Sequence, residues 1–234
     1  MMDDLAPLIV LPGLMCDSRC FPSIRDAFPA VHVIDDFYGD CSRLEQMAEH
    51  ALSTLPVQFA LLGHSMGARI ALEIYRIAPH RVTRLALAST GVHEVRDGEA
   101  EKRHSLLRLG RDRGIDALCD AWLPPMLTAS SLADPFMMDS LTSMIHDAGV
   151  ECYSRQISAL LNRREVMSVL HAIDVPTVAI VGECDQWSPV SQHRDIVKAV
   201  PGCDLDVVRD SGHMLPSEQP DAFRRAVSKW YYGA

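Results

Sequence analysis

The sequence predicts an α/β fold in which a mostly parallel sheet of about six strands is flanked by helices. Three observations support this prediction. Short apolar runs alternate with amphipathic helical runs along most of the chain. A Gly-x-Ser-x-Gly pattern centred on Ser65 joins one such strand to one such helix, and an aspartate and a histidine follow the ends of later strands. With 234 residues, 48% of them hydrophobic, the chain can bury one sizeable core.

Short apolar or β-branched runs predict the strands, at residues 8–11, 31–34, 60–62, 85–88, 177–181 and 204–208. Apolar residues at helical spacing predict the helices of the same layer structure, at residues 43–55, 68–78, 192–200 and 221–230. Ser188 and Pro189 predict an N-cap followed by proline at the first helical position.

The interval 92–171 departs from this alternation because it holds no good strand. Its amphipathic stretches lie at residues 104–110, 135–146, 150–161 and 166–173. A normal crossover needs one helix of about a dozen residues, so we expect a helical lid inserted after the fourth predicted strand. The core is then formed by 1–91 and 172–234. The alternative is that these helices belong to the ordinary outer layer.

Ser65 lies between the strand predicted at 60–62 and the helix predicted at 68–78, which is the context of a nucleophile elbow. Such a turn strains the serine backbone, and only glycine fits two residues to either side of it. The hydroxyl then lies above the sheet, at a helix N-terminus that favours negative charge. We expect His64, next to this serine, to be structural because it points the other way.

A serine nucleophile needs a base and an acid. His213 follows the strand predicted at 204–208, and Asp185 follows the strand predicted at 177–181. Parallel strands bring their carboxyl ends together, so these side chains can converge on Ser65. Asp210 is the rival acid, although it shares the loop of His213 and is better placed to cap a turn.

These motifs, together with Leu-Pro-Gly-Leu-Met at residues 11–15, resemble the α/β-hydrolase superfamily, and within it small lidded esterases and lactonases of the pimeloyl-ester esterase and 3-oxoadipate enol-lactonase type. Two departures are visible. Pro12 stands where the family usually has histidine, and Ala68 stands where a third glycine is common. Because the first predicted strand comes so early, we expect the leading antiparallel hairpin of the family to be missing.

The resemblance implies a serine hydrolase that cleaves a small carboxylic ester or lactone through an acyl-enzyme. Ser65, His213 and Asp185 would form the triad, and the backbone N–H groups of Leu14 and Met66 the oxyanion hole. No cofactor or metal is expected. The alternatives are a carbon–carbon bond hydrolase or lyase on the same triad and, in a different class, a non-catalytic receptor or scaffold.

The net charge of −9 argues against nucleic acid and anionic membranes as partners. We expect a cytoplasmic protein with reduced thiols, because the seven cysteines are scattered and no signal peptide or membrane span is apparent. The oligomeric state is left open.

Several side chains are candidates for the pocket wall, each with a plainer structural alternative. Methionines of the predicted lid either line an acyl pocket or pack the lid against itself: Met126, Met137, Met138, Met144 and Met167. Lid arginines either clamp a substrate carboxylate or form solvated helix surface: Arg155, Arg163 and Arg164. Two cysteines either reach the pocket or are packing residues: Cys16 and Cys184.

Overall fold

Six strands form one parallel sheet in the computed structural model, which describes residues 5–25, 27–28 and 30–233. The strand order is β2-β1-β3-β4-β5-β6. The strands are β1 (Leu8–Leu11), β2 (Val31–Val33), β3 (Phe59–His64), β4 (Val82–Ala88), β5 (Thr177–Gly182) and β6 (Asp204–Val208). The six predicted strands are thus confirmed, and their ends differ from the predicted ones by at most three residues.

The burial of the strands follows their place in the sheet. Every residue of β1, β3 and β5 is buried, whereas the edge strands β2 and β6 are mostly half-buried or exposed. A parallel sheet covered on both faces needs apolar residues on both sides of its inner strands, which is why they appear in the sequence as unbroken apolar runs. No antiparallel strand pair occurs within the described residues.

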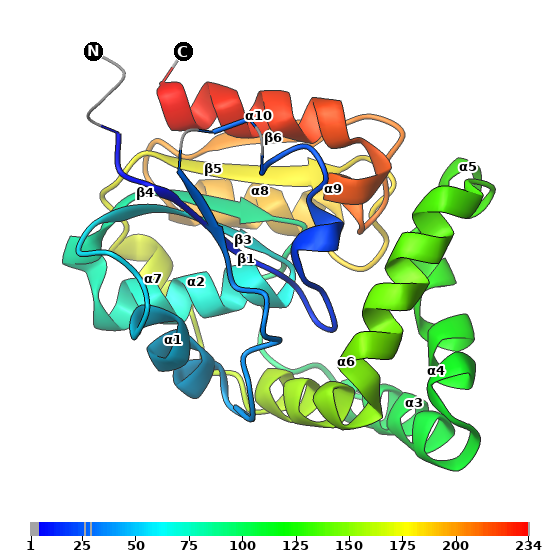
Figure 1. The fold of residues 1–234 in the computed structure, drawn as a ribbon. Coiled ribbons are helices and arrows are strands. Elements are labelled where there is room, and N and C mark those ends of the chain that lie inside the picture. The colour runs from blue at the N-terminus through cyan, green and yellow to red at the C-terminus, as the bar shows by residue number, and fades with distance from the viewer. Residues whose placement is uncertain (1–4, 26, 29, 234) are drawn as a thin grey trace.

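Helices cover both faces of the sheet (Figure 1). On one face, α1 (Leu44–Leu52), α2 (Met66–Ile77), α7 (Met167–His171) and α8 (Val190–Ala199) form a contacting layer. On the other face, α10 (Pro220–Tyr232) packs on β4, β5 and β6, and α9 (Leu215–Glu218) precedes it. Single 3-10 turns complete the core: η1 (Ser18–Cys20) and η2 (Pro79–Arg81).

The remaining helices lie between β4 and β5 in sequence. They are α3 (Glu99–Arg113), α4 (Ile115–Trp122), η3 (Pro124–Met126), α5 (Ala129–Leu132) and α6 (Pro135–Leu161). Figure 1 shows α3 to α6, in green, beyond the carboxyl ends of the strands. The stretches predicted at 135–146 and 150–161 are two arms of α6, which is kinked at Gly149 (φ 74°, ψ 168°). Helices α4 and α5 were not predicted.

The N-terminus of α8 corrects one prediction. Pro189 is the N-cap residue of this helix, and no side chain caps it. The helix therefore begins at Val190, one residue later than predicted. The backbone N–H of Ser188 donates to the Asp185 carboxylate, at 2.8 Å. Among the helices that the structure describes, none combines the length and the apolar character needed to span a bilayer.

Candidate active site

Ser65 connects β3 to α2 in a strained backbone conformation, with φ 55° and ψ −115°. A positive φ is uncommon for any residue other than glycine and has to be held by its surroundings. The Ser65 N–H donates to Ala88 O on β4, at 2.8 Å, and the Thr90 hydroxyl donates to Ser65 O, at 3.1 Å. The turn is therefore fixed on both sides by the segment that ends and follows β4.

Steric crowding leaves room only for glycine at the two positions that flank this turn, Gly63 and Gly67. A Cβ on Gly63 would lie 2.4 Å from the Ala68 Cα, and a Cβ on Gly67 would lie 1.9 Å from the Leu11 carbonyl oxygen. Both contacts are with backbone atoms, which have little freedom to move away. The steric reason given for the Gly-x-Ser-x-Gly pattern thus holds in this chain.

The structure brings His213 to Ser65 across 148 positions of sequence. His213 follows β6 and is buried, and its Nε2 lies 2.8 Å from Ser65 Oγ. Its backbone N–H donates to Met126 O of η3, also at 2.8 Å. The loop that carries His213 is therefore held by the inserted segment, through Met126.

Asp185 completes this hydrogen-bonded row. Its Oδ2 lies 2.9 Å from His213 Nδ1, and its Oδ1 accepts the N–H groups of Trp187 and Ser188, at 2.9 and 2.8 Å. Burial alone raises the pKa of this carboxyl. The charge of His213, its hydrogen bond and the two backbone donors outweigh burial, and the pKa falls from 3.8 to about 2. Asp185 is therefore ionised at neutral pH and holds His213 with Nδ1 protonated.

Asp210, the rival acid, lies apart from this row. It is exposed, its backbone is left-handed (φ 53°), and its backbone oxygen accepts a hydrogen bond from Gln219. Its carboxylate has no hydrogen bond to another described residue. Of the two candidate acids, the structure brings Asp185 to His213.

His64 lies under the imidazole of His213, with ring centroids 5.6 Å apart. Its Nε2 lies 2.8 Å from His213 O. Burial, and next the neighbouring His213, lower the pKa of His64 to about 4, so the ring is neutral at pH 7 and Nε2–H is the donor. This contact agrees with the structural role predicted for His64.

The backbone N–H groups of Leu14 and Met66 have no protein partner within the described part of the chain. Both residues line the same cavity as Ser65. The loop that carries Leu14 is held by α6, because Gln156 Oε1 accepts the N–H of Met15 at 2.7 Å and Gln156 Nε2 donates to Phe37 O at 3.1 Å. Two unpaired N–H groups beside the serine are what an oxyanion site requires.

Glu218 connects the loop of His213 to the inserted helices. One carboxylate oxygen accepts the N–H of Gly212 at 2.9 Å, and the other accepts the N–H of Thr128 and the hydroxyl of Ser131, both at 2.9 Å. Sequence patterns did not point to Glu218 or to Gln156, since each acts through partners far away in the chain.

A cavity of about 490 Å³ opens over Ser65 and His213. The inserted helices supply apolar wall residues: Leu106, Trp122, Met126, Tyr153 and Leu160. Trp187 adds an exposed ring whose centroid lies 5.9 Å from that of His213. Size and lining suit a small organic ligand.

The candidate wall residues divide accordingly. Met126 lines the cavity, whereas Met137, Met138 and Met144 pack in or against the core and Met167 is exposed. Cys16 lines the cavity, and Cys184 is exposed outside it.

The three arginines considered in the inserted segment differ in the same way. Arg163 lines the cavity, and its buried side chain forms an ion pair with Glu99. It is therefore not part of a solvated helix surface. Arg155 and Arg164 lie outside it, near Asp40 and Glu73. Arg69, on α2, also lines the cavity and was not singled out from the sequence.

All seven cysteines are free thiols. Within residues 5–25, 27–28 and 30–233, no group of three or more His, Cys, Asp or Glu side chains is arranged to hold a metal ion.

Comparison with known proteins adds a family and a set of relatives. The sequence model of the alpha/beta hydrolase family matches residues 8–226. A Bacillus subtilis protein named as a 2-succinyl-6-hydroxy-2,4-cyclohexadiene-1-carboxylate synthase is 26% identical over 73% of this chain and 64% of its own length. A 2-hydroxy-6-oxononadienedioate/2-hydroxy-6-oxononatrienedioate hydrolase of Cupriavidus pinatubonensis is 27% identical over 71% of this chain and 60% of its own. The chain thus spans less than two thirds of the length of these relatives.

Two solved structures share the fold at lower identity. An esterase from Thermogutta terrifontis superposes with a TM-score of 0.86 at 22% identity, covering 97% of this chain and 90% of the esterase. The enol-lactonase from Burkholderia xenovorans LB400 superposes with a TM-score of 0.85, also at 22% identity, covering 98% of this chain and 92% of the lactonase.

Proposed function

Because this chain belongs to the alpha/beta hydrolase family, we propose that it is a serine hydrolase that cleaves a small carboxylic ester or lactone, with Ser65, His213 and Asp185 as its catalytic triad. One observation carries the proposal. Ser65 Oγ, both ring nitrogens of His213 and the Asp185 carboxylate form one row with contacts of 2.8 and 2.9 Å, beside a cavity of about 490 Å³. The esterase and enol-lactonase of the same fold support this substrate class by analogy.

The proposed reaction proceeds through an acyl-enzyme. His213 Nε2 takes the proton of Ser65 Oγ as the oxygen attacks the carbonyl carbon, and it returns the proton to the departing alkoxide. Asp185 holds the Nδ1–H tautomer and stabilises the imidazolium that forms in between. Water, deprotonated by His213, then attacks the acyl carbon. The bond between this carbon and Ser65 Oγ breaks, the acid leaves, and His213 Nε2 returns the proton to Ser65 Oγ.

The negative oxygen of each tetrahedral intermediate would be held by the N–H groups of Leu14 and Met66. Removing one such donor typically lowers the rate roughly 100- to 1000-fold. We assign residues 92–171 as the lid, since α3, α4 and α6 contribute wall residues to the cavity above Ser65. Within that range α7 packs against α2 and α8 of the core.

A fluorophosphonate probe tests the nucleophile. We expect mass spectrometry to find the label on Ser65, and Ser65→Ala protein to stay unlabelled. Ser188→Ala is the matched control because Ser188 lines the same cavity without a histidine partner for its hydroxyl, and this variant should be labelled like the wild type. A label on another residue, or active protein without any label, would contradict the assignment.

A substrate panel separates the candidate reactions. Short and medium p-nitrophenyl esters and lactones should be turned over by wild-type protein and not by Ser65→Ala. Turnover of ring-fission dienones in their place would favour the carbon–carbon hydrolase or lyase. Failure of both labelling and turnover would favour a receptor or scaffold.

A further inference from the structure

The cavity wall has a positive charge that contrasts with the acidic chain. Its Arg, Lys, Asp and Glu residues are five cations and two carboxylates: Arg69, Arg96, Lys102, Arg103, Arg163, Asp97 and Glu99. The wall thus has a surplus of three positive charges in a chain of net charge −9. A cleft lined by charges of one sign concentrates ligands of the opposite charge.

Arg69 is the member of this wall closest in sequence to the proposed nucleophile. It lies four residues after Ser65, near the start of α2, and both residues line the same cavity. Arg69 is only 5% exposed, and its Nη2 donates to His93 O at 2.6 Å. Its Nη1 is buried and has no hydrogen-bond partner among the described residues.

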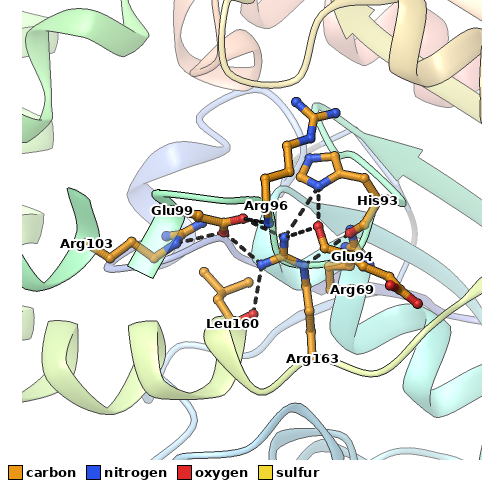
Figure 2. A network of polar contacts seen from close by, with 8 residues as sticks. All are labelled: Arg69, His93, Glu94, Arg96, Glu99, Arg103, Leu160 and Arg163. Carbon is orange, nitrogen blue, oxygen red and sulfur yellow. Dashed lines mark hydrogen bonds and ion pairs between the residues drawn. The ribbon is translucent and has the colours of Figure 1, made fainter. Parts of the chain in front are cut away.

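The carboxylates near Arg69 are bonded to other cations. Glu99 forms ion pairs with Arg163, at 2.7 Å, and with Arg103, at 3.0 Å. Figure 2 shows the Arg163 guanidinium at the centre of this network, with Glu99 on one side and His93 and Glu94 on the other. Glu73 is likewise paired with Arg76 and Arg164. No ion pair joins Arg69 to any carboxylate in the described part of the chain.

The surroundings of Arg69 destabilise its positive charge. Burial, and next the nearby Arg163, lower the pKa of Arg69 from 12.5 to about 9, so the side chain is still a cation at pH 7. It also lies near the N-terminus of α2, where the helix dipole favours negative charge. A buried cation without a counter-ion is costly unless a ligand supplies the opposite charge.

We propose that Arg69, with Arg96 and Lys102 at the exposed rim, forms an anion subsite, and that the substrate carries a carboxylate a few bonds from the carbonyl that Ser65 attacks. The proposal rests on the proposed function, since it names the substrate class of the same site. Arg69 Nη1 donates to this carboxylate, while Glu99 holds Arg163 and Arg103 in the wall behind it. The substrate class is therefore the monoesters of short dicarboxylic acids and lactones that bear a carboxylate.

Binding without chemistry is the first test. On Ser65→Ala protein at fixed ionic strength, succinate, glutarate and adipate are compared with their diamides by thermal shift and calorimetry. At least one dicarboxylate should raise the melting temperature and its diamide should not. Adding Arg69→Met should weaken that dicarboxylate roughly 10- to 100-fold, as expected for one hydrogen bond between charged groups.

Kinetics is the second test. Wild-type protein should cleave mono-p-nitrophenyl glutarate, or its homologue of the preferred length, with a kcat/KM at least about 10-fold above that of the neutral terminal amide. Arg69→Met should remove this preference by lowering kcat/KM for the monoester to about that for the amide, and Arg69→Lys should keep part of it. Arg113→Met, on an exposed residue outside the cavity, is the matched control. If Arg69→Met does not fold, Arg96→Gln with Lys102→Gln should lower the preference in a salt-dependent way.

The outcomes separate the two proposals. Ester turnover without any preference for the anion, and without a dicarboxylate shift, would overturn the anion subsite and leave the serine hydrolase standing. A dicarboxylate shift that depends on Arg69, in protein that cleaves no ester and takes no fluorophosphonate label, would support the subsite and overturn the proposed function.

Discussion

Replacing Asp185 by asparagine should lower kcat about 10⁴-fold, as the corresponding change does in a serine protease. Asp185 Oδ1 accepts two backbone N–H groups, which orients the side-chain oxygen of an asparagine toward them. The new Nδ2 then faces His213 Nδ1 and donates to it. The imidazole is forced into the Nε2–H tautomer, which has no free lone pair to take the proton of Ser65.

The same substitution has a calculable effect on stability. The pKa of Asp185 falls from 3.8 to about 2 on folding, so its ionised form contributes about 2 kcal/mol at pH 7. Asparagine lacks this contribution, and a protein of this size loses roughly 2–4 °C in Tm per kcal/mol. We therefore expect Asp185→Asn to melt about 4–8 °C below the wild type, a loss too small to explain the loss of activity at 25 °C.

Asp210→Asn is the matched control for charge and shape. Asp210 is exposed with a left-handed backbone, a conformation that asparagine tolerates well, and its carboxylate has no hydrogen bond in the described chain. Both kcat and Tm should stay near the wild-type values. The sequence alone had instead indicated that Asp210 caps a turn and that its replacement lowers the stability. Steady-state kinetics and calorimetry on both variants decide the matter, and a large loss of kcat in Asp210→Asn alone would refute the assignment of the acid.

Three further outcomes follow from the same contacts. Since the folded-state pKa of Asp185 is depressed, its contribution to the free energy of unfolding is present above about pH 4 and is lost as the pH falls toward 2. The Tm of the wild type should therefore fall more steeply over this range than the Tm of Asp185→Asn. Glu218→Gln places an amide beside three donors and should lower the free energy of unfolding, measured with denaturant, by about 1–3 kcal/mol. Glu183→Gln, on an exposed side chain, should leave the free energy of unfolding unchanged. Gln156→Leu leaves the Met15 N–H without its acceptor and should lower kcat about 10- to 100-fold, because the neighbouring Leu14 would shift. Gln46→Leu, at an exposed position, should leave kcat unchanged. Equal kcat in the two variants would mean that Gln156 does not position this loop.

The strands and the three polar groups of the site were accessible from sequence because each depends on local pattern. An inner parallel strand has to be apolar on both faces, and the turn at Ser65 has no room for a Cβ at Gly63 or Gly67. The positions of Asp185 and His213 then follow from the topology, since strand ends meet at one edge of the sheet.

The parts that sequence did not reveal depend on contacts between distant segments. Arg69 resembles any helical arginine until its missing counter-ion is seen, and Gln156 resembles any helix residue until its side chain meets Met15. The methionines show the converse. Their number suggested a flexible pocket, yet of those considered only Met126 reaches the cavity, because most of the others fill space between the inserted helices and the core.

The inserted helices contact both loops that the proposed mechanism uses. From α6, Gln156 accepts the N–H of Met15, next to Leu14. From η3, the Met126 carbonyl accepts the N–H of His213. At the start of α5, the Thr128 N–H and the Ser131 hydroxyl donate to Glu218, which also accepts the N–H of Gly212 in the same loop. If these helices were removed, the buried N–H groups of Met15 and His213 would lose their acceptors, which the core does not replace. The insertion therefore does more than cover the site, because it supplies the acceptors for two N–H groups in the loops that carry Leu14 and His213.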